Sequence, residues 1–274
     1  MKTRIISATV GIALFIGAIV LALCVHPIIL NILLALVGAI GVYEALYNTK
    51  YVKSWSLVVP CLIFALATPF AINGYISVQT DAFVVLLCVF VLTLSMFKHK
   101  TVTPLESAYA VALTLVVTYC FSAMAAIFGS SDGHGLFYMI LMFIAAWSCD
   151  TGAYFTGYFF GKHKMAPEIS PKKTIEGAIG GIITSVVVMV AACLVFGAVT
   201  EFTANTLLIA LLTPILSFAG MMGDLVASYI KRASGIKDYG NIMPGHGGVI
   251  DRFDSVMMIA PIMYVLLSFC SFVV

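Results

Sequence analysis

The chain has 274 residues, of which 62% are hydrophobic and only 9% are charged. Soluble globular domains are about 45–50% apolar and about 25% charged, so this composition excludes a water-soluble domain, a disordered chain and a disulfide scaffold. The net charge of +2 gives no indication of a polyanionic partner, and we expect no nucleic-acid binding. The seven cysteines show neither CxxC nor CxxH spacing, so we interpret them as small hydrophobic residues.

Nearly uncharged stretches follow one another along the whole chain, and about 20 apolar residues suffice for a helix to cross a bilayer. The candidate spans are 5–25, 27–47, 55–72, 82–97, 105–128, 135–160, 174–199, 206–230 and 249–272. Runs of this length favour helices over the alternating strands of a membrane barrel. We therefore predict an all-α, polytopic membrane bundle of about nine helices. We expect one membrane domain over 1–274, with N-terminal helices in 1–128 and C-terminal helices in 135–274.

Positive charge sets the expected orientation, because Lys and Arg accumulate in cytoplasmic loops. With the predicted spans, all 14 cationic residues fall on one side of the membrane. The N-terminus is therefore predicted to be cytoplasmic and the C-terminus to lie outside. The opening Lys2, Arg4 and apolar run resemble a signal peptide, but no small-residue cleavage site follows, so we interpret the run as a membrane anchor.

Two windows, 150–176 and 224–254, hold 15 of the 26 charged residues, and both reach the predicted cytoplasmic face. Charge in loops needs no functional explanation. Asp150 and Asp224 do, because they lie inside otherwise apolar spans, where an ionised carboxylate costs about 2.5–3.5 kcal/mol and normally faces a polar cavity or a partner. We interpret both as candidate site residues.

The second window combines both signs of charge with a glycine-rich loop. Ser228 and Lys231 follow Asp224 at i+4 and i+7, so the three share one helical face. Three glycines in 244–248 favour a backbone nest that holds phosphate, although an ordinary glycine turn is the simpler interpretation of the pattern alone. Asp251 and Asp254 share a face of the next helix, and carboxylate oxygens together with substrate phosphates are usual Mg²⁺ ligands. The combination indicates phosphoryl or nucleotidyl transfer.

The first window adds a basic string before the seventh span. Ser170 or Thr174 can cap that helix, and Glu176 suits its first turn. Lys172 and Lys173, at a helix start on the predicted cytoplasmic face, could bind a lipid headgroup phosphate or a nucleotide triphosphate. For Lys162 and Lys164, generic attraction to anionic lipid is an equally good interpretation. His246 either donates to phosphate or hydrogen-bonds the turn, and the lack of a neighbouring histidine disfavours a zinc site.

At this point the sequence resembles the bacterial type of the phosphatidate cytidylyltransferase (CDP-diacylglycerol synthase) family. The residues that match its signature are Ser228, Lys231, Arg232, Lys237, Asp238, Gly240, Pro244, His246, Gly247, Gly248, Asp251, Arg252 and Asp254. A second block matches at Asp150, Ala153, Tyr154 and Gly157 and from Ser170 to Gly177. Met243 departs from the usual Leu, Ile or Phe.

The resemblance implies that phosphatidate and CTP give CDP-diacylglycerol and pyrophosphate with Mg²⁺, and whether a second cation assists is left open. It implies Asp224 and Asp251 as metal ligands and catalytic residues, supported by Asp254, with Lys231 and Arg252 also catalytic. It assigns the following residues to substrate binding: Asp150, Ser170, Lys172, Lys173, Ser228, Arg232, Lys237, His246, Gly247 and Gly248. It further implies a multi-pass protein of the inner membrane, in contact with membrane lipids, with a cytoplasmic active site and a homodimeric state.

Two other functions fit parts of the pattern. A CTP- or ATP-dependent kinase of a lipid alcohol would use the same phosphate-binding equipment, with Asp150 or Asp238 as general base. A cation-coupled transporter would use intramembrane Asp150 and Asp224. The polar residues gather at one predicted face instead of at mid-membrane, and no inverted repeat is evident, which disfavours the transporter.

Overall fold

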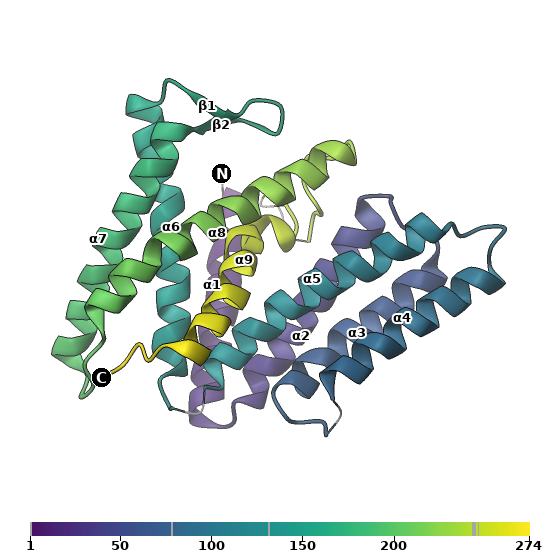
Figure 1. Ribbon diagram of the computed structural model, residues 1–274, viewed down its shortest axis with the longest axis horizontal. Helices are drawn as coiled ribbons and strands as arrows, with labels where there is room; N and C mark the ends of the chain where they lie inside the picture. The colour runs from purple at the N-terminus through teal and green to yellow at the C-terminus, as the bar shows by residue number, and fades with distance from the viewer. Residues whose placement is uncertain (1, 78, 131, 243–244, 246) are drawn as a thin grey trace. The chain divides into compact units, whose positions relative to one another are not determined.

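The computed structural model of the chain describes residues 2–77, 79–130, 132–242, 245 and 247–274 (Figure 1). The described residues form nine α-helices, one π-helical turn and two short strands. The helices are α1 (Lys2–Cys24), α2 (Ile28–Tyr43), the π-helix η1 (Glu44–Asn48), α3 (Trp55–Ile72), α4 (Thr80–Phe97), α5 (Pro104–Phe128), α6 (Gly135–Phe160), α7 (Ile175–Val199), α8 (Thr206–Ala233) and α9 (Ile250–Phe269). The strands are β1 (Lys164–Ala166) and β2 (Ser170–Thr174).

The predicted helical membrane protein is confirmed. Each of the nine predicted stretches coincides with a helix to within three residues at either end, with α2 and η1 counted as one. Eight helical segments of the described chain are long and apolar enough to cross a membrane, and α1 adds a shorter apolar segment, Thr9–Cys24. Large apolar side chains such as Leu14, Leu86 and Val187 are more than half exposed, as expected of surfaces that contact lipid.

The described chain divides into two compact units. The first comprises Met1–Gly129 and Ile230–Phe253, so the end of α8, the following loop and the first turn of α9 group with the N-terminal helices. Within it α2, α3 and α5 pack on one another, α4 packs on α3 and α5, and α1 packs on α2. Its core includes Val42, Leu57 and Phe121, none of which is measurably exposed.

The second unit comprises Ser130–Tyr229 and Asp254–Val274. Its largest packing surface lies between α6 and α7, where small residues let the two backbones approach closely. A Cβ built on Gly181 would lie 2.7 Å from the Cys149 carbonyl oxygen, so only glycine fits there. Whether the whole chain acts as a single functional domain stays a prediction.

A β-hairpin that the sequence pattern did not predict precedes α7. β1 and β2 pair antiparallel, with Lys164 opposite Thr174 and Ala166 opposite Ser170. The Thr174 hydroxyl accepts a hydrogen bond from the Gly177 backbone N–H at 3.1 Å, which confirms Thr174 as the helix cap. Ser170, the other candidate cap, lies at the start of β2. The hairpin therefore presents Lys172 and Lys173 from a strand.

Candidate active site

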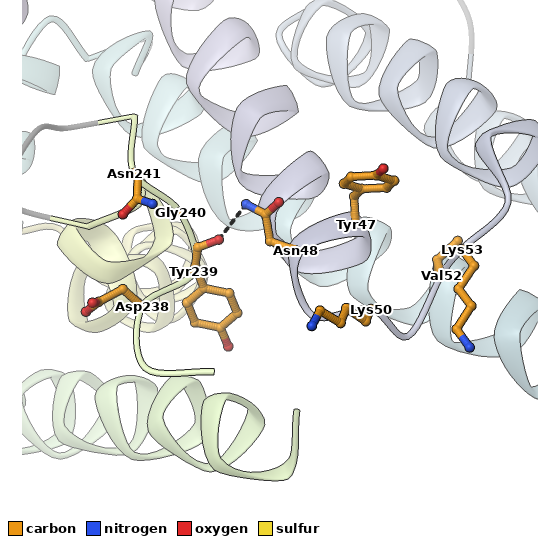
Figure 2. A pocket seen from close by; sticks show the side chains of 9 residues that line it. All are labelled: Tyr47, Asn48, Lys50, Val52, Lys53, Asp238, Tyr239, Gly240 and Asn241. Carbon is orange, nitrogen blue, oxygen red and sulfur yellow. Dashed lines mark hydrogen bonds between the residues drawn. The ribbon is translucent and has the colours of Figure 1, made fainter. Parts of the chain in front are cut away.

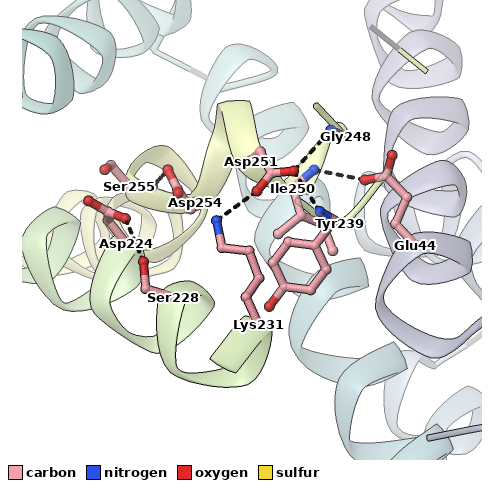
Figure 3. Close-up of polar contacts among 10 residues, drawn as sticks. All are labelled: Glu44, Asp224, Ser228, Lys231, Tyr239, Gly248, Ile250, Asp251, Asp254 and Ser255. Atoms are coloured by element: carbon pink, nitrogen blue, oxygen red, sulfur yellow. Dashed lines mark hydrogen bonds and ion pairs between the residues drawn. The ribbon is translucent and has the colours of Figure 1, made fainter. Parts of the chain in front are cut away.

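Asp251 is the best-anchored carboxylate of the first unit (Figure 3). It lies in the first turn of α9, and its side chain is only 3% exposed. Its Oδ1 receives the Lys231 ammonium at 2.7 Å, and its Oδ2 accepts hydrogen bonds from the backbone N–H groups of Tyr239 at 2.7 Å and Gly248 at 2.9 Å. The carboxylate thus fixes the loop between α8 and α9 while Lys231 neutralises its charge.

The glycine-rich loop adopts the backbone that its composition predicts. Gly245 and Gly247 have positive φ angles of 78° and 84°, a region that residues with a Cβ rarely adopt. A Cβ on Gly247 would also lie 2.9 Å from Asp251 Oδ2, so this glycine allows the loop to close around the carboxylate. His246, Met243 and Pro244 lie outside the described residues, and the proposed role of His246 stays a prediction.

Glu44 is a buried carboxylate that the sequence pattern did not identify. It begins η1 at the end of α2, has no exposed surface, and accepts a hydrogen bond from the Ile250 backbone N–H at 3.1 Å through Oε2. A Cβ on Gly240 or Gly248 would lie 2.4 or 2.5 Å from its oxygens. Glu44 therefore explains why glycine is needed at two signature positions. In the sequence, the one feature that could have indicated Glu44 is its position as a charged residue near the end of the apolar span 27–47.

Asp224 is the centre of a polar cluster in the second unit. Its Oδ2 lies 2.7 Å from the Lys173 ammonium, and its Oδ1 accepts a hydrogen bond from the Ser228 hydroxyl at 3.3 Å. Lys173 also donates to the Met221 carbonyl oxygen at 3.4 Å. The pattern of Asp224 and Ser228 on one face of α8 is confirmed, and the hairpin supplies a partner that spacing along α8 could not indicate.

Asp150 belongs to the same unit and receives a hydrogen bond from the Ser255 hydroxyl at 3.2 Å. Asp254 precedes Ser255 in α9 and accepts a hydrogen bond from its backbone N–H at 2.8 Å. The intramembrane carboxylates singled out from the sequence thus have polar neighbours, as the cost of burying them requires.

The other predicted site residues lie on the surface of their own units. Among the predicted site residues, Lys172 is exposed on β2 of the second unit, and Arg232, Lys237 and Arg252 are exposed in the first unit. The predicted residues thus fall into two groups, one in each unit. The first unit holds Lys231, Arg232, Lys237, Gly247, Gly248, Asp251 and Arg252; the second holds Asp150, Ser170, Lys172, Lys173, Ser228, Asp224 and Asp254.

The carboxylate chemistry suits a hard divalent cation, because Mg²⁺ binds oxygen ligands and keeps waters or substrate phosphates in its remaining positions. Each carboxylate oxygen has about two acceptor sites. Counting only contacts among the described residues, one site is occupied on each Asp224 oxygen and one on Asp251 Oδ1, so within that part of the chain these atoms retain acceptor capacity. No group of three or more His, Cys, Asp or Glu side chains in the described ranges could hold a metal alone. Sharing of one cation by Asp224 and Asp251 stays a prediction.

Helices that can cross a membrane, together with carboxylates held by ammonium groups, define a polytopic membrane protein with a candidate phosphate-transfer site. A family model described as "Cytidylyltransferase family" matches residues 2–270. A phosphatidate cytidylyltransferase of Bacillus subtilis (strain 168) is 33% identical over 278 residues, which cover 99% of each chain. The chain belongs to the cytidylyltransferase family.

Two further relatives carry the same name. A phosphatidate cytidylyltransferase of Staphylococcus aureus (strain COL) is 34% identical over 272 residues, covering 97% of this chain and 99% of that protein. One of Staphylococcus haemolyticus (strain JCSC1435) is 49% identical over 140 residues, about half of each chain. The resemblance recognised in the signature residues is therefore confirmed over nearly the full length.

Proposed function

We propose that the chain transfers the cytidylyl group of CTP to phosphatidate, giving CDP-diacylglycerol and pyrophosphate. The observation that carries this proposal is the near full-length similarity to phosphatidate cytidylyltransferases, together with a signature loop that is organised around Asp251. A lipid alcohol kinase is not favoured, because the relatives are named for cytidylyl transfer.

The reaction is limited by charge repulsion more than by nucleophilicity. With a second pKa of about 6, by analogy with phosphorylated side chains, the phosphomonoester of phosphatidate is largely dianionic at neutral pH and needs no general base. One of its oxygens attacks the α-phosphorus of CTP, the bond between the α-phosphorus and the bridging oxygen breaks, and pyrophosphate leaves with that electron pair. Cationic side chains must hold both anions together and stabilise the leaving group.

The chain's own residues supply that screening. Lys173 and Lys231 each hold an ammonium group beside a carboxylate, and exposed Lys172, Arg232, Lys237 and Arg252 add positive charge in the same segments. We infer that these groups bind the phosphates of CTP and phosphatidate, with Ser170, Ser228, His246 and the glycine loop completing the binding surface. Ion pairing keeps the lysines positioned before substrate arrives.

We propose Mg²⁺ as the cofactor, held by Asp224 and Asp251 with Asp254 in support. When bound, it would neutralise phosphate charge and assist the departure of pyrophosphate. The free acceptor sites on both carboxylates support this assignment.

We propose that the active site faces the cytoplasm at the inner membrane, and that the protein acts as a homodimer in contact with membrane lipids. The positive-inside distribution supports the orientation, since CTP is cytosolic and phosphatidate lies in the bilayer. A site at that boundary reaches both substrates.

The test is turnover of the purified full chain in detergent, supplied with phosphatidate, Mg²⁺ and CTP labelled either in cytidine or in the γ-phosphate. Cytidylyl transfer places the cytidine label in lipid and releases the γ-label as pyrophosphate. A kinase places only the γ-label in lipid when a lipid alcohol is supplied. Absence of cytidine label from lipid would overturn the proposed activity.

A further inference from the structure

A pocket of about 780 Å³ lies in the first unit (Figure 2). Its lining includes two signature residues, Asp238 and Gly240, but none of the residues that the resemblance assigns to metal binding, catalysis or substrate binding. Volumes of about 300–1,000 Å³ are typical of small-molecule sites. One wall comes from η1 and the connection to α3, and the other from the segment before the glycine loop. Its lining residues are Tyr47, Asn48, Lys50, Val52, Lys53, Asp238, Tyr239, Gly240 and Asn241.

The charge of the pocket favours an anion. Lys50 and Lys53 come from one wall, and Asp238 is the single carboxylate in the lining. Within the described part of the chain, neither lysine ammonium forms an ion pair, and both side chains are exposed. The Lys53 backbone is nevertheless fixed, because its N–H donates to Glu106 Oε1 at 2.7 Å. A fixed backbone with an unpaired ammonium is an arrangement suited to binding an anion.

Lys50 adopts an unusual backbone conformation. Among the described residues, it is the one non-glycine residue with a positive φ, at 63°. Its N–H donates to the Tyr47 carbonyl oxygen at 3.1 Å, and Lys50 lies two residues after the end of the π-helical turn Glu44–Asn48. Single π-turns and left-handed non-glycine residues are both frequent at functional sites, where the surrounding structure holds a conformation that costs free energy. Two such features occur within seven residues of this wall.

The pocket is joined directly to the candidate catalytic carboxylate of the same unit. Asn48 donates its side-chain N–H to the Tyr239 carbonyl oxygen at 2.6 Å, and the Tyr239 backbone N–H donates to Asp251 at 2.7 Å. One residue therefore belongs both to the pocket wall and to the contacts that hold Asp251. A ligand in the pocket lies beside the segment that orients this carboxylate.

We propose that this pocket binds a phosphate group of a substrate through the ammonium groups of Lys50 and Lys53. The inference rests on the proposed function, which supplies two phosphate-bearing molecules: the triphosphate of CTP and the phosphomonoester of phosphatidate. Lysine ammoniums bind phosphate as compact point charges, and the flanking Asn and Tyr side chains offer additional hydrogen-bonding groups.

The test compares K50Q/K53Q with the matched control K98Q/K100Q, which removes two exposed lysines from the connection between α4 and α5. The full-length proteins are purified in detergent and checked for equal thermal unfolding. Equilibrium dialysis gives the Kd for labelled CTP, and mixed micelles of varied phosphatidate content give the lipid KM. We expect K50Q/K53Q to raise one of these constants at least fivefold and K98Q/K100Q to change neither by more than twofold.

The two arms identify the source of the phosphate. A raised Kd for CTP alone assigns the triphosphate, and a raised KM for phosphatidate alone assigns the lipid phosphomonoester. If both constants for K50Q/K53Q stay within twofold of the wild type, the proposal is wrong.

Amine labelling of the wild-type protein provides a test that needs neither a stable variant nor turnover. Mass spectrometry follows acylation of Lys50, Lys53, Lys98 and Lys100 with CTP, with phosphatidate micelles and with neither. Selective protection of Lys50 and Lys53 by either ligand supports the pocket, and equal labelling under all three conditions overturns it. A chain that binds CTP at these lysines but makes no CDP-diacylglycerol would overturn the proposed activity alone.

Discussion

Asp224 and Asp251 differ in the number of contacts that each makes and in their burial. We therefore expect substitution of Asp224 to affect mainly turnover, and substitution of Asp251 to affect both turnover and stability. Asp224 contacts one ammonium and one hydroxyl and is 31% exposed, whereas Asp251 receives three donors and is 3% exposed. We expect Asp224→Asn to lower turnover at least 100-fold with little change in unfolding temperature. Asp251→Asn should lower both turnover and the unfolding temperature, because it weakens the contacts that hold the loop between α8 and α9. CDP-diacylglycerol formation and thermal unfolding in detergent measure the two effects, and retained activity in either variant would remove the metal assignment.

The pair of Lys231 and Asp251 should show strong energetic coupling. Removing one partner of a buried ion pair leaves an uncompensated charge and typically costs about 3–5 kcal/mol. Lys231→Met should therefore destabilise the protein strongly, while Lys231→Met combined with Asp251→Asn should cost less than the sum of the single changes. The free energies of unfolding of the wild type, both single variants and the double variant, measured with denaturant in detergent, form the double-mutant cycle that tests this coupling. Additive losses would mean that the 2.7 Å contact contributes little in solution.

Glu44 provides a third residue-scale prediction. Glu44→Ala removes the acceptor for the buried Ile250 N–H, and an unsatisfied buried donor costs about 1–3 kcal/mol. It also removes the carboxylate that Gly240 and Gly248 pack against, so we expect lower stability together with lower turnover. Glu201→Ala, at an exposed position before α8, is the matched control. Wild-type turnover in Glu44→Ala would show that the loop holds its conformation without this side chain.

At the scale of elements, close packing of α6 and α7 depends on small residues. Gly181→Ala would place a Cβ 2.7 Å from a backbone oxygen of α6, whereas nothing lies within 4 Å of a Cβ on Gly197 in the same helix. Alanine is favoured over glycine inside a helix by about 1 kcal/mol. The two changes should therefore act in opposite directions, with a lower unfolding temperature for Gly181→Ala and an equal or higher one for Gly197→Ala. Equal shifts would contradict the packing described for this pair.

The helices could be predicted from the sequence because length and hydrophobicity alone define a membrane span. The hairpin could not be predicted, since strands of three and five residues rich in lysine carry no hydrophobic period. The glycine loop and its carboxylates were recognisable from their spacing and signature. The partners Glu44 and Lys173 were not, because their contacts join positions 206 and 51 residues apart.

At the scale of the whole molecule, the one-sided distribution of positive charge predicts how the chain is inserted. A cysteine introduced at Lys100 should react with a membrane-impermeant maleimide only from the cytoplasmic side, and one at Val274 only from outside. The wild-type protein serves as the control, because it shows how strongly the native cysteines, including exposed Cys24, are labelled. The measurement compares intact cells with inverted vesicles. Labelling of both positions from one side would rule out an odd number of crossings between them.

Besides the pairing of β1 with β2, hydrogen bonds join the segment before β1 to the first turn of α7. The backbone N–H groups of Lys162 and His163 donate to the Glu176 carboxylate at 3.1–3.3 Å, and the Ile175 N–H donates to the His163 carbonyl oxygen at 3.0 Å. Lys172 and Lys173 therefore lie on a hairpin whose backbone is fixed to α7 by hydrogen bonds, and not on a flexible loop. The conformational entropy of that backbone is therefore lost during folding and not during binding. An arriving anion has to immobilise only the exposed side chain of Lys172, because the Lys173 ammonium is already held by Asp224.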